Sequence, residues 1–297
     1  MTNRCVEKCH DHGTRYVVLN GKIFMRSGEL VFPGGPDSEG VVLNQSECRS
    51  LLKTLGGSII QWTDGFQTEN KHGEWYSVIC RRFMPLNVLP AKRRSEINRG
   101  LRNCKVTQIT VEELADAGYR VLCQACKGYA GKVNVPSEEV FKKNVLREAP
   151  FQDLVHNWGV YAQGMLIAFA QNQIYGTVEA NYSSIKLDPA HLGLYPAYAL
   201  IHTMNEYYLD RNGFQYVNDG SRSVYHETNI QDFLMRKFGF EKAYATLHVY
   251  YSWPLRWLVS LAYPFHAHLG HLNRRLKALL ELERCRRASN PSANDKQ

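Results

Sequence analysis

The sequence lacks any apolar run long enough to cross a membrane. Its longest nearly uncharged apolar stretch is WPLRWLVSLAYPF, residues 253 to 265, whereas a membrane-spanning helix needs about 20 apolar residues. Residues 1 to 15 are polar and rich in histidine, and they lack the apolar centre of a secretory signal. We therefore expect a cytoplasmic protein whose membrane contact, if any, is made on the cytoplasmic face.

The sequence also has few motifs that would support cysteine chemistry or metal binding. The absence of a secretory signal predicts that the eight cysteines are free thiols. Cys123 and Cys126 form a single CxxC inside a predicted helix, with no second pair, which favours two small residues on a helix face. A denser cluster of ligand-type side chains lies near the start of the chain: Cys5, Cys9, His10 and His12. A frayed terminus fixes donors poorly, so we predict a loosely packed tail there and no metal site.

The composition is that of a folded protein. The chain has 297 residues, of which 44% are hydrophobic and 22% charged, enough to bury a sizeable core. Its net charge of +8 suits nucleic acid, an anionic membrane or an acidic small molecule equally well. Charge alone therefore selects no partner.

The first 90 residues have the pattern of a small α/β layer. Residues 14 to 32 contain two β-type runs joined through Asn20-Gly21, a strong hairpin signal. A helix is expected over 44 to 56, with Ser46 as its cap and Gly56 as its stop. Strands are expected in SIIQWT and EWYSVICRRF.

The pattern continues with helices and a meander. Helices are expected in three segments: 91 to 104, 111 to 131 and 138 to 149. The apolar runs after Trp158 are separated by turns at Gln163-Gly164 and around Asn172 and Gly176, which predicts an antiparallel meander. A helix that ends at Asn212-Gly213 follows, with Leu200, Met204, Tyr207 and Tyr208 on one face, and then come a strand, a helix over 229 to 238 and a last strand. We predict an α/β fold with a mixed, mostly antiparallel sheet flanked by helices.

A stretch of cations occupies the helix that starts at residue 91. Its members are Lys92, Arg93, Arg94, Arg99, Arg102 and Lys105. At helical spacing they would form a stripe suited to phosphates. They would equally form a solvated face over the core, and no aromatic residue is interleaved as single-strand binders require.

One polar loop is longer than its connection needs. Thr228 and Gln231 fit a capping box, and Gly239-Phe240 suits a Schellman close, so the helix over 229 to 238 should begin near Thr228. Residues 219 to 227 are thereby left between the carboxyl end of a strand and the start of a helix, the usual place for ligand groups in open α/β sheets.

The functional interpretation of this loop assigns a role to each reactive side chain. Asp219 or His226 would accept a proton, Arg222 would clamp an anion and Tyr225 would donate a hydrogen bond. The flanking Asn218 and Ser221 are candidates for substrate binding. In the alternative interpretation the loop is ordinary, Asp219 caps a turn and His226 is a surface residue.

These patterns resemble a known family. The order of helix, meander, helix, strand, a helix ending in FGF and a final strand resembles the acyl-CoA N-acyltransferase (GNAT) fold. RRSEINRGLRNCKV at 93 to 106, and ALIHTMNEYYLDRNGFQYVNDG followed by NIQDFLMRKFGF, resemble segments of the Fem-type peptidyltransferases and their polysaccharide-locus relatives. The resemblance covers about residues 90 to 252.

The resemblance implies transfer of an acyl or aminoacyl group from acyl-CoA or aminoacyl-tRNA to an amine of a sugar or cell-envelope precursor. In members of the fold that use coenzyme A, the pyrophosphate lies on a glycine-rich turn, whereas the Fem-type members lack this signature and use aminoacyl-tRNA. The matching segment, DPAHLGLYPAYALIH, offers only Gly193, with Leu194 and Tyr195 beside it. Arg94 and Arg99 would contact the phosphates of either donor.

The implied chemistry needs a base, an oxyanion donor and an acid. His226 has the natural pKa for the base, and Asp219 would orient it or bind the amine. Glu179 and Tyr182 lie on the last meander strand, but a spacing of three allows at most one of them to face the cleft unless a bulge intervenes. A catalytically degenerate GNAT-fold protein that binds an anionic partner through residues 92 to 105 is the alternative, and a nucleic-acid-binding protein ranks third.

The C-terminal part couples the apolar segment to a basic helix. Tryptophan, tyrosine and nearby cations favour a membrane surface, whereas helix docking or self-association as a homodimer would give the same pattern. We divide the chain into a small α/β region at 1–90, the GNAT-like domain at 91–252, terminal helices at 253–287 and a disordered tail at 288–297.

Overall fold

The computed structural model describes residues 2–66, 73–127, 134–222, 229–269 and 273–289. The chain divides into two compact units that alternate along the sequence. Unit 1 comprises Met1–Val78, Ser221–Asp232 and Lys242–Gln297, and unit 2 comprises Ile79–Gly220 and Phe233–Glu241. Compactness does not show which segment folds on its own, so the sequence-based division at residues 90 and 252 stays a prediction.

Unit 1 contains a mixed sheet with the strand order β1-β2-β3-β4-β11. Its strands are β1 (Tyr16–Leu19), β2 (Lys22–Ser27), β3 (Leu30–Gly34), β4 (Ile59–Phe66) and β11 (Glu241–Tyr251), the last beginning one residue before the unit does. All neighbours are antiparallel except β3 and β4. The predicted hairpin is confirmed, since Asn20 and Gly21 both have positive φ between β1 and β2.

Helices cover both faces of this sheet. They are α1 (Thr2–Asp11), α2 (Gln45–Leu55), α8 (Trp253–Ala262), α9 (His266–Leu269) and α10 (Arg274–Ser289), with the 3-10 turn η5 (Tyr263–Phe265). Helix α2 packs Leu51 and Leu55 onto Ile60 of β4. Helices α8 and α10 pack Val259 and Leu282 on the opposite face, which Ile59 and Leu247 line. Successive strand residues thus serve two cores.

Unit 2 holds the predicted meander and a parallel neighbour, in the order β10-β9-β8-β7-β6. Its strands are β6 (Lys105–Gln108), β7 (Val155–Ala162), β8 (Met165–Tyr175), β9 (Glu179–Leu187) and β10 (Tyr216–Ser221), the last ending one residue after this part of the unit does. The first four pair antiparallel, and β10 runs parallel to β9. The predicted mixed, mostly antiparallel sheet is confirmed.

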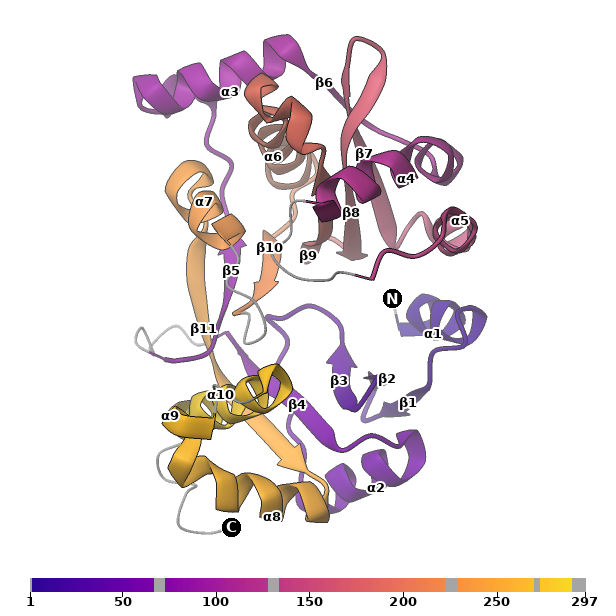
Figure 1. Ribbon diagram of the computed structural model, residues 1–297, viewed down its shortest axis with the longest axis vertical. Coiled ribbons are helices and arrows are strands. Elements are labelled where there is room, and N and C mark those ends of the chain that lie inside the picture. The colour runs from indigo at the N-terminus through magenta and orange to yellow at the C-terminus, as the bar shows by residue number, and fades with distance from the viewer. Residues whose placement is uncertain (1, 67–72, 128–133, 223–228, 270–272, 290–297) are drawn as a thin grey trace. The chain divides into compact units, whose positions relative to one another are not determined.

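The helices of unit 2 flank its sheet (Figure 1). They are α3 (Ala91–Asn103), α4 (Val111–Lys127), α5 (Glu138–Leu146) and α6 (Pro196–Asn205), with the 3-10 turns η1 (Leu86–Val88), η2 (Ala149–Phe151) and η3 (Pro189–Leu194). A π-helical turn, η4 (Glu206–Arg211), extends α6. Leu114 of α4 and Phe141 of α5 pack on Phe169, whereas α6 packs Met204 against Asn172 from the other face.

Two further elements contain residues of both units. Strand β5 (Tyr76–Cys80) and helix α7 (Asn229–Phe238) occur where strand and helix were predicted. Gly239 has a φ of 72° directly after α7, as the predicted glycine stop requires. The predicted cap at Thr228 lies outside the described residues.

Three local predictions are wrong. The cap of α2 is Asn44, which makes a full capping box with Glu47, and Ser46 only donates to the Asn44 side chain. Asn172 lies in the middle of β8 and is fully buried, so the only turn between β8 and β9 is the one near Gly176.

The third error concerns the beginning of the chain. The segment predicted to be a loose tail forms α1, and Cys9 on it is buried with its thiol donating to Met25 Sδ at 3.5 Å. Burial raises the pKa of the Cys9 thiol, which favours its protonated form. Packing against β2 therefore orders a terminus whose sequence carries no strong helix signal.

Candidate active site

The parallel pairing of β10 with the amino end of β9 brings together several of the predicted site residues. The register pairs Tyr216 with Glu179 and Asn218 with Asn181. Side chains alternate between the two faces of the sheet, so these four lie on one face. Asp219 and Tyr182, each one residue further on, lie on the other.

The first face is organised around a buried carboxylate. Glu179 is fully buried and accepts three hydrogen bonds, from Tyr216 Oη at 2.6 Å, Asn218 Nδ2 at 2.9 Å and Asn181 Nδ2 at 3.0 Å. Neutral donors from the same strand and from β10 thus satisfy the carboxylate, as burial of such a group requires. This arrangement joins the two strands side chain to side chain, in addition to their backbone ladder.

The second face carries Asp219. Burial raises the pKa of the Asp219 carboxyl to about 7, because the ionised form loses its hydration there. Its neighbour Tyr182 is buried and donates to Asn205 Oδ1 on α6 at 2.7 Å. Burial raises the pKa of Tyr182 well above its usual range, and the charges of Tyr208, Cys80 and Asp219 add to this effect. The face therefore pairs a carboxyl that titrates near neutrality with a phenol that stays protonated.

Glu179 and Tyr182 project from opposite faces, as their spacing of three residues requires. Only Tyr182 shares a face with Asp219. The roles assigned to Glu179 and Tyr182 from the sequence stay predictions. The two side chains lie in separate environments, on opposite faces of the sheet.

The strand end next to Asp219 is held by local hydrogen bonding. Asn218 is buried, and its Oδ1 accepts the Gly220 N–H at 2.8 Å while its Nδ2 serves Glu179. Gly220 has a φ of 89°, in the left-handed region that favours glycine. Together these features hold the backbone around Asp219, within the last half of β10.

Arg222, predicted as an anion clamp, lies in unit 1 and contacts carboxylates of the chain itself. Its guanidinium donates to Glu74 Oε2 at 2.6 Å and to Glu281 Oε1 at 2.7 Å. Arg284 joins both carboxylates, at 3.2 Å and 2.8 Å. Ser221 is also in unit 1, with its hydroxyl oxygen 3.3 Å from that of Ser77. The predictions for Tyr225 and His226 lie outside the described residues.

The segment predicted to bind the acyl donor, DPAHLGLYPAYALIH, leads into α6. Asp188 caps η3 through the Ala190 N–H and binds Arg120 at 2.8 Å. Gly193 is exposed, and a Cβ at this position would meet nothing within 4 Å. Tyr195 takes a left-handed backbone conformation with φ of 64°, which is costly for a bulky residue. The segment is thus open at its surface and strained at its junction with α6.

The basic helix α3 lies against this junction. Gly100 packs so closely that a Cβ there would come within 2.6 Å of the Tyr195 carbonyl oxygen. Arg99 is exposed and places its guanidinium 4.8 Å from the centre of the Tyr195 ring. Arg94 is also exposed, whereas Arg93 donates to the Arg236 carbonyl at 2.7 Å near the end of α7. The cationic stripe therefore combines packing contacts with exposed charge.

Sequence reasoning missed the residues that hold this site together. Tyr216, Asn181 and Asn205 each hydrogen-bond a predicted site residue. The polar identity of Asn205 at the end of the largely apolar helix α6 was a usable signal. The partner of Tyr216 was not predictable, because the parallel register of β9 with β10 joins it to Glu179, 37 positions away in the sequence.

Two further searches of the described parts of the chain were negative. No described helix is long and apolar enough to cross a membrane. Nor does any group of three or more histidine, cysteine, aspartate or glutamate residues within the described segments have the arrangement of a metal site.

Comparison with known proteins identifies the fold. No protein-family model and no curated protein sequence matches the chain. Among solved structures, the C-terminal DUF2156 domain of a protein described as a lysylphosphatidylglycerol synthetase, from Agrobacterium fabrum, is similar with a TM-score of 0.55 and 11% identity, over 88% of this chain and 94% of that one. FemX is similar with a TM-score of 0.55 and 12% identity, over 86% and 92%. The chain therefore has the GNAT-like fold of the Fem type that its sequence resembles.

Proposed function

We propose that this protein is an N-acyltransferase that uses Asp219 as its general base. It would move an acyl or aminoacyl group from acyl-CoA or aminoacyl-tRNA to an amine of a sugar or of a cell-envelope or polysaccharide precursor. The observation that carries the proposal is the Asp219 carboxyl, whose pKa is raised to about 7 by burial at the carboxyl end of β10. A base is most effective when its pKa lies near the working pH.

Besides the general base, the reaction needs few groups from the protein. The acceptor nitrogen attacks the donor carbonyl, a C–N bond forms, and the C–S or C–O bond to the leaving group breaks. Asp219 takes the proton that the nitrogen loses. Tyr182 stays protonated on the same face and is a candidate donor to the oxyanion or the leaving group, once a substrate competes for its bond to Asn205.

The donor phosphates would be bound mainly by side chains. In α6, Pro196 has no N–H to offer, and the N–H groups of Tyr198 and Ala199 both bond to the Tyr195 carbonyl. This helix start therefore differs from a glycine-rich phosphate cradle. The exposed Arg99, on the Tyr195 ring, and Arg94 supply charge for a pyrophosphate or a tRNA backbone.

Asp219→Asn tests the proposal. Donors are first selected by thermal shift with acetyl-CoA, longer acyl-CoAs and aminoacyl-tRNA, because a ligand of the folded state raises the melting temperature. With a productive donor, kcat/KM should rise with pH up to about 7 and then level off. D219N should lower kcat on the order of 10²- to 10⁴-fold and abolish this pH dependence.

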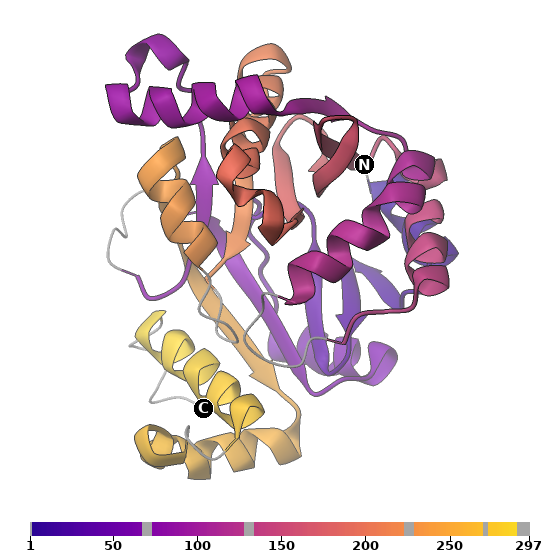
Figure 2. The ribbon, with the colours of Figure 1, turned by 45° about the horizontal axis from the view of Figure 1, so that its top comes forward.

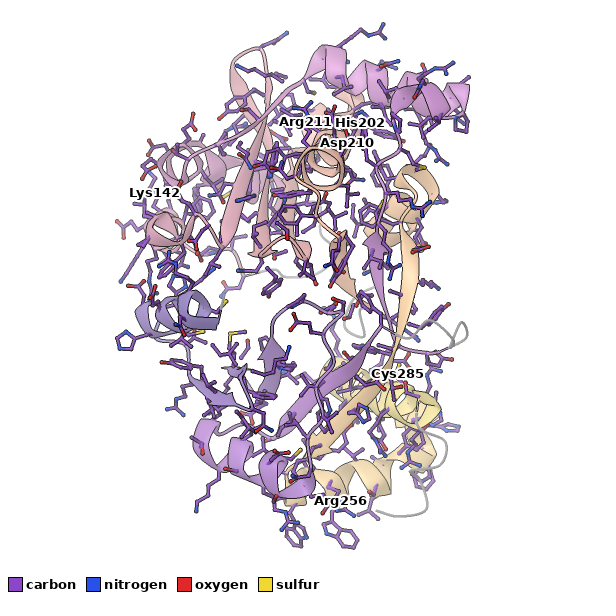
Figure 3. All side chains as sticks on the ribbon, turned by 180° about the vertical axis from the view of Figure 1, so that it is seen from behind. Lys142, His202, Asp210, Arg211, Arg256 and Cys285 are labelled. Carbon is purple, nitrogen blue, oxygen red and sulfur yellow. The ribbon has the colours of Figure 1, made fainter. Side chains whose placement is uncertain are left out.

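The matched control is Asp210→Asn, an exposed aspartate on η4 of the same unit (Figure 3). It should keep the rate and the pH profile of the unchanged chain. Retention of full activity and of the pH dependence by D219N would remove Asp219 from the mechanism. Failure of every donor to bind or react would reject the transferase proposal, and a charge reversal at Arg94 and Arg99 that alone abolished function would favour the anion-binding alternative.

A further inference from the structure

We infer that α8 and η5 form a docking surface for an anionic lipid bilayer. The large apolar side chains there have unusually high exposed fractions: Trp253 74%, Trp257 57%, Leu258 63%, Leu261 67% and Phe265 60%. We call these five residues the α8 patch. Contiguous apolar patches of this kind on a folded protein mark a partner surface or a membrane contact.

The distribution of tryptophan sets the α8 patch apart. The chain has five tryptophans. Trp62, Trp75 and Trp158 are at most 8% exposed, so these three tryptophans are core residues. Both remaining tryptophans lie on the outer side of a single helix. Tryptophan is the residue type that favours the headgroup region of a bilayer.

The inner side of the same segment is already occupied. Leu255 and Val259 pack into the core beneath β11 and α10, and the Arg287 guanidinium lies 4.0 Å from the centre of the Tyr263 ring and ties η5 to α10. Figure 2 shows α10 beside α8. At 100° per residue, Trp253, Trp257 and Leu261 follow one line along the opposite side of α8. The residues of the α8 patch are therefore not members of the core that α8 and α10 form with the sheet.

Charge selects an anionic lipid surface over a neutral one. Between residues 253 and 280 there is no aspartate or glutamate, whereas four arginines and lysines occur: Arg256, Arg274, Arg275 and Lys277. All four are exposed. Arg256 is on α8 itself, where Figure 3 labels it, next to Trp257, so it can reach a phosphate while the indole enters the headgroup layer.

The first acidic residues after this segment are neutralised within the chain. Glu281 binds Arg222 and Arg284, and Glu283 binds Arg286 and Arg287. An apolar face whose own segment of the chain carries four arginines and lysines and no carboxylate fits a bilayer of anionic lipid better than a second copy, because two such faces would place their cations against each other.

The test is co-sedimentation of the full chain with vesicles of phosphatidylglycerol and phosphatidylcholine, compared with phosphatidylcholine alone. We expect binding to the anionic vesicles that weakens in 0.5 M salt. Trp257→Ser with Leu261→Ser should weaken it at least about tenfold. R256Q and K277Q should each weaken it about fivefold.

The matched control is Val42→Ser with Val88→Ser, two exposed apolar residues elsewhere. It should bind vesicles like the unchanged chain, and all variants should keep their melting temperature because the altered side chains are exposed. The inference is overturned if the full chain does not bind anionic vesicles, or if W257S/L261S binds them equally well. It is also overturned if light scattering finds a dimer that W257S/L261S dissociates and no vesicle binding, since a second copy would then cover the α8 patch.

Discussion

At the scale of single residues, the position of Asp219 could be predicted from the sequence, whereas its raised pKa could not. A polar residue at the end of a strand and before a long loop is a local pattern, so sequence reasoning selected it. Its raised pKa depends on burial, and its neighbour Tyr182 comes from β9, which only the parallel register places beside it. Such pairings between distant residues leave no trace in a single sequence.

Asp219 should also cost the protein stability. Its pKa is higher in the folded chain, at about 7, than its ordinary 3.8. Between these two values the folded state binds more protons, so Asp219 makes the free energy of unfolding fall as pH rises. D219N should therefore stabilise the protein by about 1–2 kcal/mol at pH 8.

The measurement is urea unfolding of both proteins at pH 8 and at pH 3, where Asp219 is protonated in both states and the difference should vanish. A D219N variant that is less stable than the unchanged chain at pH 8 would show that the carboxylate makes favourable contacts and is not merely desolvated.

At the scale of elements, most helices and strands were predictable because their signals are local. Periodicity located α3, α4, α7 and the meander. The errors arose where tertiary packing decides. Asn172 has the composition of a turn, but it donates from the interior of β8 to Tyr208 Oη at 3.1 Å, and α1 is ordered by its contact with β2.

The contact of α3 with α6 gives a prediction in which two effects oppose each other. Replacing a glycine inside a helix by alanine usually stabilises by about 0.5–1 kcal/mol. At Gly100 the new Cβ would come within 2.6 Å of the Tyr195 oxygen and 3.0 Å of the Ala199 nitrogen, both of which are backbone atoms. Because backbone cannot move aside without shifting α6, G100A should destabilise by about 1–3 kcal/mol.

Thermal or urea unfolding measures this effect, with Gly193→Ala as the control, since Gly193 has open space around it. G193A should leave stability nearly unchanged. If G100A were as stable as the unchanged chain, α3 would not be packed against α6 as closely as described.

At the scale of the whole molecule, the fold class was predictable, and the side-chain contacts between distant segments were not. The two compact units alternate along the chain, so each of them gathers residues from separate parts of the sequence. The network of Glu74, Arg222, Glu281 and Arg284 is an example, because it joins three distant parts of the sequence inside unit 1. Arg222 attracted a functional interpretation because its carboxylate partners lie far away in the sequence.

Removing either arginine from this network should lower the stability of the protein without a specific loss of substrate binding. R222A and R284A should each destabilise by about 1 kcal/mol at pH 7, since the pairs are partly exposed. Hydrogen bonds from Arg284 and Arg222 lower the pKa of Glu74, and Arg284 does the same for Glu281. The stabilisation is therefore present above the ordinary glutamate pKa and is lost as pH falls through the lowered values.

Urea unfolding at pH 7 and pH 3, with KM for the donor measured in parallel, tests this. Equal destabilisation by both variants with unchanged KM supports the structural role. A raised KM in R222A alone, with normal stability, would instead support the anion clamp predicted from the sequence.

The pairing of β4 with β11 has a consequence for synthesis on the ribosome. Thr246 donates its N–H to Asp64, 182 residues earlier in the chain. Strand β4 thus gains this partner only after 182 further residues have been made, and the edge that faces β11 is meanwhile available to other nascent chains. Loop closure over such a distance is also entropically slow. The protein should therefore depend on chaperones while it is translated, and truncation near residue 240 should leave unit 1 unable to complete its sheet.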